Sequence, residues 1–112
     1  MKLRTREVYG AVIVDIEGHL VGGPNSETFR LFISDLLKQG KTRIIVNLRR
    51  CPWANSQGIG MLIGAYRNAR NAGGDLVLSN VTDKIQSLLT ITKLITVFDC
   101  HDSLEEAIQS FK

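Results

Sequence analysis

The chain has 112 residues, of which 44% are apolar and 22% charged, and this composition predicts one globular domain with a single core over residues 1–112. Its formal net charge of +3 is small and dispersed, so we expect no nucleic acid partner. No apolar run approaches the ~20 residues of a membrane-spanning helix, so we expect no membrane partner either.

The first third of the chain is predicted to form two strands and a helix. Residues 2–8 mix charged with apolar side chains, as edge strands do, and residues 11–16 are a nearly continuous β-branched run typical of a buried strand. Asn25 and Ser26 then precede a helix that Gly40 ends. The apolar stripe of this helix recurs at helical spacing and consists of Phe29, Phe32, Ile33, Leu36 and Leu37.

Strands and helices alternate through the remaining two thirds. We expect strands over residues 42–48, 75–78 and 95–98, and helices over residues 56–71, after Asn80 or Thr82, and from the Ser-x-x-Glu capping box at residues 103–106. The predicted order is β-β-α-β-α-β-α-β-α. This order predicts an α/β domain whose mixed, mostly parallel sheet is packed with four helices.

The junction between the central strand and the second of these helices is the most informative part of the sequence. Ser56 stands where backbone N–H groups lack partners, because the first amides of a helix have no preceding turn to bind. The simplest interpretation makes Ser56 an N-cap that stabilises the helix by about 1 kcal/mol. The alternative is that its hydroxyl accepts a phosphate, which a helix N-terminus favours.

Gly58, Gly60 and Trp53, all near Ser56, favour the second interpretation. Gly58 and Gly60 weaken the first turn of the helix by about 1 kcal/mol each relative to alanine, yet they leave an open backbone that another molecule can approach closely. Ile59 between them belongs to the buried stripe and anchors the start of the helix. Trp53 precedes them on a loop, where it either fills the core or marks a contact surface.

Residues 42–64, which include Asn55-Ser56-Gln57-Gly58-Ile59-Gly60, resemble the STAS domain family of sulphate-transporter and anti-sigma-factor-antagonist domains. The stretches at 73–78 and 94–98 also look like later elements of that family, so the resemblance covers nearly the whole chain. It implies a STAS-type fold and a regulatory protein rather than an enzyme. The N-terminus has no hydrophobic block after its charges and so does not resemble a signal peptide, and we therefore expect a cytoplasmic location.

The resemblance implies that this protein acts in transcription control and that phosphorylation switches its binding to a partner. Family members of this kind bind an anti-sigma factor that is also an ATP-dependent serine kinase, and this binding frees a sigma factor. The kinase phosphorylates the serine that here is Ser56, and a PP2C-type phosphatase reverses the modification. Asn55, Gln57, Gly58, Ile59 and Gly60 would then be partner-binding residues. ATP and Mg²⁺ would belong to the kinase, so we expect no cofactor on this chain.

Two positions depart from the family pattern. Asn55 replaces the usual aspartate before the phosphoacceptor, and asparagine can cap a helix but cannot act as a base. Gln57 replaces the usual second hydroxyl residue and so removes an alternative acceptor. The loop at residues 18–24 also differs, because Val21 follows Gly18-His19-Leu20 where an aspartate is common.

Alternative functions remain open at this stage. The domain could be a constitutive STAS adaptor without phosphorylation, or a nucleotide- or anion-binding domain that uses the same helix N-terminus. The dinucleotide pattern is incomplete, and the G-x-S-x-G of hydrolases is absent. Arg49, Arg50, Arg67 and Arg70 form either a solvated face or a docking patch for an acidic partner. The two cysteines are predicted to be free thiols, and the two histidines to be loop residues rather than metal ligands.

Overall fold

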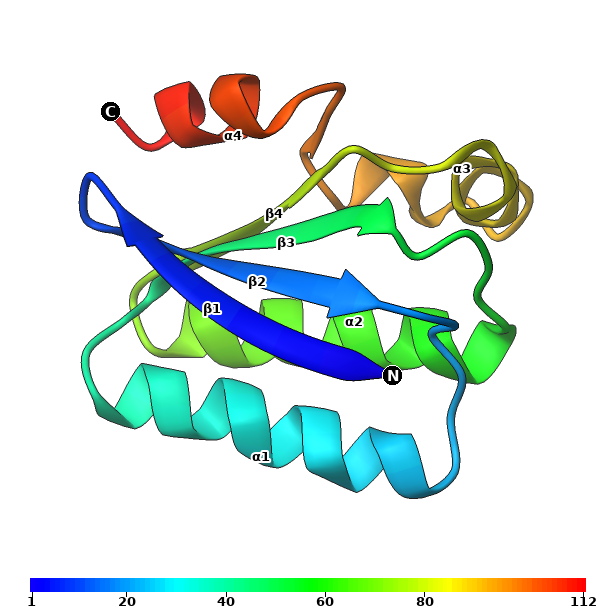
Figure 1. The fold of residues 1–112 in the computed structure, drawn as a ribbon, viewed down its shortest axis with the longest axis horizontal. Helices are drawn as coiled ribbons and strands as arrows, with labels where there is room; N and C mark the ends of the chain where they lie inside the picture. Colours follow the sequence, from blue (N-terminus) through cyan, green and yellow to red (C-terminus); the bar gives the residue numbers. More distant parts are fainter.

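The computed structural model describes all residues, 1–112, and contains one sheet with the strand order β1-β2-β3-β4-β5 (Figure 1). β1 is antiparallel to β2, and each later pair of neighbours is parallel. Parallel neighbours need crossover connections, which the intervening helices provide. The strands are β1 (Lys2–Val8), β2 (Ala11–Glu17), β3 (Arg43–Arg50), β4 (Asp75–Ser79) and β5 (Cys100–His101).

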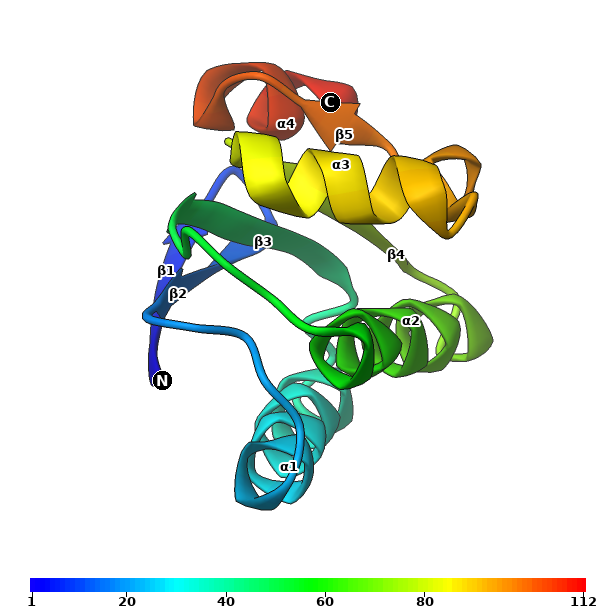
Figure 2. The same cartoon turned by 90° about the vertical axis from the view of Figure 1, so that its right-hand side faces the viewer.

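Helices cover both faces of this sheet. α1 and α2 lie side by side against one face, and α4 lies against the other (Figures 1 and 2). The helices are α1 (Pro24–Lys38), α2 (Ser56–Asn71), α3 (Asp83–Ile91) and α4 (Leu104–Ser110), with a short 3₁₀ helix, η1 (Leu94–Thr96), after α3. The predicted α/β class, with a mostly parallel sheet and four helices, is confirmed.

The sheet separates two apolar clusters because side chains alternate between its faces. On β2, Val12 and Val14 point toward α1 and α2, whereas Ala11 and Ile13 point toward α4. The larger cluster holds 21 buried residues and the smaller one five. The larger cluster therefore fixes the position of α2, whose N-terminus carries Ser56.

The prediction of a strand over residues 95–98 is wrong. Lys93 has a left-handed backbone with φ 62°, and the chain then forms η1 instead of extending. Phe98 is buried, and its ring meets Tyr66 edge-on with ring centroids 5.5 Å apart. The last strand is only the short β5, which pairs with β4 after this packed turn. Burial against α2 thus decides the conformation of a segment whose β-branched composition alone favours a strand.

One predicted helix start is wrong, and another is confirmed but lacks the expected side-chain cap. α1 begins at Pro24 after the N-cap Gly23, rather than after Asn25 and Ser26, because proline suits the first position of a helix. Thr82 is the N-cap of α3, but its hydroxyl donates to the Cys51 carbonyl at 3.0 Å instead of capping. The predicted Ser103 cap of α4 is confirmed, since its hydroxyl accepts from the Glu106 N–H at 3.1 Å.

Candidate functional site

The N-terminus of α2 is capped by Asn55, not by Ser56. Asn55 has an extended backbone, and its side-chain oxygen accepts a hydrogen bond from the Gly58 N–H at 2.8 Å. Its carbonyl accepts from the Ile59 N–H at 3.0 Å. The interpretation of Ser56 as an N-cap is therefore wrong, because Asn55 already performs that role.

Ser56 is the first residue of α2, and its side chain is exposed. Its hydroxyl has no hydrogen-bond partner within the chain, and neither do the N–H groups of Ser56 and Gln57. The first turn of α2 contains no acidic residue. The hydroxyl is therefore accessible, and an anion attached to it would meet two free amides and the positive end of the helix dipole.

The loop between β2 and α1 packs against this helix start. Leu20 is buried, and its N–H donates to the Trp53 carbonyl at 3.0 Å, while its own carbonyl accepts from the Asn55 N–H at 3.2 Å. These two bonds form a small parallel bridge between the two loops. The loop at residues 18–24 therefore lies beside Ser56, and the main chain of Leu20 is a part of the site that no sequence motif indicates.

Gly58 has a different role from the predicted one. A Cβ atom at this position would lie 1.9 Å from the Leu20 carbonyl oxygen, so the missing side chain makes room for the chain's own loop. Gly58 and Ile59 are both buried, and neither presents a surface that a partner can touch. Gly60 is exposed, and nothing lies within 4 Å of a Cβ built there. Close approach from outside is therefore possible at Gly60 but not at Gly58.

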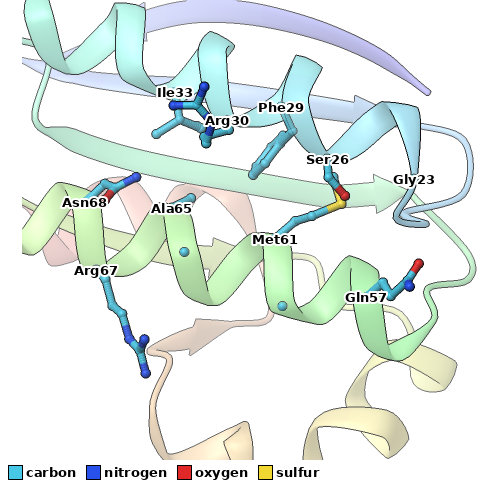
Figure 3. A pocket seen from close by; sticks show the side chains of 12 residues that line it. Gly23, Ser26, Phe29, Arg30, Ile33, Gln57, Met61, Ala65, Arg67 and Asn68 are labelled. Atoms are coloured by element: carbon cyan, nitrogen blue, oxygen red, sulfur yellow. The ribbon is translucent and has the colours of Figure 1, made fainter.

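A groove of about 520 Å³ runs between α1 and α2 and starts at this site (Figure 3). Phe29 and Ile33 of α1 and Ala65 of α2 line it with apolar surface, and Gln57 and Met61 extend toward it from α2. The groove remains open on the α2 side because Gly60 and Gly64 have no side chains there. The spacing of these two glycines, four residues apart and off the buried stripe, is the signal that could have predicted it.

The four arginines discussed above do not form one basic surface beside Ser56. Arg67 lines the groove and extends away from α1, eleven residues or about 16 Å along the helix from Ser56. Arg70 lies over the Tyr66 ring and pairs with Asp75 at 3.7 Å. Arg49 and Arg50 line a separate hollow on the sheet.

Trp53 lies on the surface with 41% of the residue exposed, so it does not fill the core. Its ring meets His19 edge-on, with centroids 5.6 Å apart. An exposed tryptophan three residues before Ser56 is a natural contact for another protein, because tryptophan supplies a large rigid surface.

The remaining titratable candidates do not gather at the site. No three His, Cys, Asp or Glu side chains are placed to hold a metal ion. Both cysteines are free, as predicted, and burial raises the pKa of the Cys51 thiol. None of the helices combines the length and the apolar character that crossing a membrane would need.

Comparisons with known proteins place this chain in a family. The family model of the STAS domain matches residues 2–107. The Bordetella bronchiseptica protein BtrV is 24% identical over all of this chain and 96% of its own length. The Thermotoga maritima protein TM1081 is 21% identical, and its crystal structure gives a TM-score of 0.88 over 96% of this chain and 92% of its own.

The anti-sigma factor antagonist SpoIIAA is 25% identical, and its structure has been solved in two forms. The unphosphorylated form gives a TM-score of 0.72 over 98% of this chain and 97% of its own. The phosphorylated form, from Bacillus, gives 0.76 over 99% of this chain and 100% of its own. Both forms share the present fold.

Proposed function

The chain belongs to the STAS domain family, and we propose that it is an anti-sigma factor antagonist switched by phosphorylation of Ser56. In its unphosphorylated form it binds an anti-sigma factor that is itself an ATP-dependent serine kinase. This binding releases a sigma factor for transcription. Because the kinase and the sigma factor act in the cytoplasm, the proposal assigns this chain to the same compartment.

The observation that carries this proposal is the exposed, unpaired hydroxyl of Ser56 at the start of α2. Phosphorylation would add a charge of about −1.5 to −2 beside the free N–H groups of Ser56 and Gln57. A negative group at such a position is stabilising by about 0.3–1 kcal/mol. The modified protein should therefore keep its fold, and only its surface should change.

The partner would touch the exposed part of the site. Gln57 and Gly60 are exposed, Asn55 is half-buried beside them, and Trp53 adds an aromatic surface on the preceding loop. A kinase surface that fits closely here would meet the new phosphate and be repelled if it carries carboxylates or apolar groups. Gly58 and Ile59 would support this contact from inside by fixing the position of the helix start.

The geometry of Asn55 bears on the rate of phosphorylation. Its side-chain oxygen is already bound to the Gly58 N–H, and an amide cannot accept a proton from the Ser56 hydroxyl as a base would. Asn55 therefore cannot take the proton that Ser56 loses, and the proposal gives that role to a group outside this chain. We expect phosphorylation of this chain to be slower than phosphorylation of its Asn55→Asp variant. A PP2C-type phosphatase would then remove the phosphate.

Intact-mass spectrometry tests the proposal. The protein is mixed with ATP, Mg²⁺ and the anti-sigma kinase encoded by a neighbouring gene. One phosphate should be added to the parent chain and to Ser87→Ala, a control at another exposed serine, but none to Ser56→Ala. If a kinase of verified activity leaves the parent chain unmodified, or modifies Ser56→Ala equally, the proposed switch is wrong.

A second function is favoured by the occupied side-chain oxygen of Asn55. The domain could be a constitutive adaptor that uses the same surface without modification. Ser56→Asp imitates part of the phosphate charge and separates the two functions. Loss of kinase binding in a pull-down with this variant supports the switch, whereas unchanged binding supports the adaptor.

A further inference from the structure

A second concave surface lies on the sheet and shares no lining residue with the groove. It is a hollow of about 520 Å³ lined only by residues of β1, β2 and β3. No helix covers this part of the sheet, because α4 packs over the other half, against Ile13 and Ile45. Five cationic side chains line the hollow: Lys2, Arg4, Arg6, Arg49 and Arg50.

The hollow keeps a positive excess after its own carboxylates are counted. Its lining contains Asp15 and Glu17, so the excess is three charges, equal to the formal charge of the whole chain. Asp15 is already neutralised by Arg6, whose Nε lies 2.9 Å from one carboxylate oxygen and whose terminal nitrogen lies 2.9 Å from the other. The Asn47 side chain donates to the same carboxylate at 2.8 Å.

The other four cations are exposed and have no ion-pair partner within the chain. Lys2 and Arg4 are two residues apart on β1, so their side chains project from the same face of the sheet. Arg49 and Arg50 reach the hollow from β3, about 10 Å away across β2. An anion in the hollow would therefore have free cations on both sides.

Protection of the sheet edge does not explain this arrangement. Charged side chains on an edge strand discourage pairing with other chains, which accounts for the cations of β1. β3 is the middle strand of the sheet, although Arg49 and Arg50 extend past the last residue that pairs with β4, and Arg50 pairs with Glu17 of β2. Edge protection therefore accounts mainly for the cations of β1. Between the arginines of β3 and the cations of β1 lie only two carboxylates of β2: Asp15, which Arg6 already pairs, and Glu17, whose register partners are Lys2 and Arg50. Positive charge therefore remains in excess, and the cations repel one another unless a further anion binds.

From these observations we propose that the hollow binds an acidic segment of a partner protein. The free cations are spread over about 10 Å, more than a single carboxylate spans, so the ligand must carry several negative charges in a row. Arginine forks match carboxylates with two parallel hydrogen bonds. The lining contains no aromatic ring on which a nucleic acid base could stack, and its one apolar side chain, Ile16, is buried, so a lipid chain would find nothing to contact.

Fluorescence anisotropy tests this proposal with a fluorescein-labelled peptide of alternating glutamate and serine. The peptide should bind the parent chain, and its affinity should fall as ionic strength rises from about 0.01 to about 0.15 M. Arg4→Glu combined with Arg49→Glu should weaken binding at least about tenfold because it reverses the charge on both sides of the hollow. The matched control, Arg67→Glu with Lys84→Glu, changes the net charge equally on other surfaces and should keep more than about a third of the affinity.

Several outcomes would overturn the proposal. The first is that the peptide does not bind the parent chain at low salt. The second is that the two double variants weaken peptide binding by the same factor. The third is that a single-stranded DNA of the same charge binds the hollow as tightly as the peptide does. Circular dichroism checks that the variants fold. If the variant with Arg4→Glu and Arg49→Glu does not fold, the variant with Arg4→Gln and Arg49→Gln replaces it. The kinase takes no part in this assay, so the result of the assay does not depend on the proposed switch. The Ser56→Asp variant should bind the peptide with the same affinity as the parent chain.

Discussion

The contrast between Gly58 and Gly60 gives the most specific prediction about the site. Both lie near the start of α2, so alanine at either position gains about 1 kcal/mol of helix propensity. At Gly58 the new Cβ would lie 1.9 Å from the Leu20 carbonyl oxygen and 2.6 Å from its carbon, both backbone atoms of a buried residue. Overpacking of this kind costs about 1–3 kcal/mol, and such a severe overlap belongs at the upper end.

We therefore expect Gly58→Ala to lower the free energy of unfolding by about 2 kcal/mol, because the overlap outweighs the gain in propensity. Gly60→Ala should raise it by about 0.5–1 kcal/mol, because its Cβ would enter open space. Urea unfolding followed by circular dichroism measures both values. In a domain of this size, the two midpoints on heating should differ by about 10 °C or more. Equal stability of the two variants would refute the packing of Leu20 against α2.

Three further predictions concern the same helix start and the hollow. Asn55→Ala removes the cap and should lower the free energy of unfolding by about 1 kcal/mol in urea. Ser56→Asp places a charge at the positive end of the helix and should leave that energy unchanged or raise it by about 0.3–1 kcal/mol. Partial burial opposes ionisation of Asp15, but hydrogen bonds from Arg6 and Asn47 outweigh it and hold the pKa of Asp15 below its usual value. Asp15 therefore stabilises the fold above its unfolded pKa of about 3.9, and this contribution disappears as the pH falls through the lower folded pKa. Asp15→Asn should be less stable than the parent at neutral pH, and the difference should shrink in unfolding curves below about pH 4.

Each of these predictions can be contradicted by a simple result. An Asn55→Ala variant with parental stability would show that the cap contributes nothing. A Ser56→Asp variant that loses more than about 1 kcal/mol would mean that the helix start does not tolerate an anion. A stability difference for Asp15→Asn that is the same at acidic and neutral pH would show that the charge of Asp15 is unimportant.

Local patterns were sufficient to predict most of the fold. The helical spacing of apolar residues after Ser56, ended by Gly73 and Gly74, predicts the observed bounds of α2. The β-branched run at residues 11–16 predicts β2, and the alternation of elements predicts the mostly parallel sheet. These features depend on periodicity and on residue preferences, which a single sequence contains.

The features that were missed depend on contacts between distant residues. Leu20 and Gly58 are 38 positions apart, and nothing in either local sequence indicates that a carbonyl of one occupies the space left by the other. Phe98 likewise points into the core, where it contacts Tyr66. The segment before it therefore forms a 3₁₀ turn instead of the expected strand. The cap assignment failed for a smaller reason, since Asn55 and Ser56 are both good N-caps and only the backbone geometry distinguishes them.

The most direct test of the proposed switch is calorimetric titration of the anti-sigma kinase with two samples of this protein. One sample is unmodified, and the other is phosphorylated at Ser56 and shown to be folded by circular dichroism. We predict that the unmodified protein binds and that the phosphorylated protein binds at least about tenfold more weakly, a loss of about 1.4 kcal/mol or more. Equal affinity of the two folded samples would contradict a switch at the start of α2.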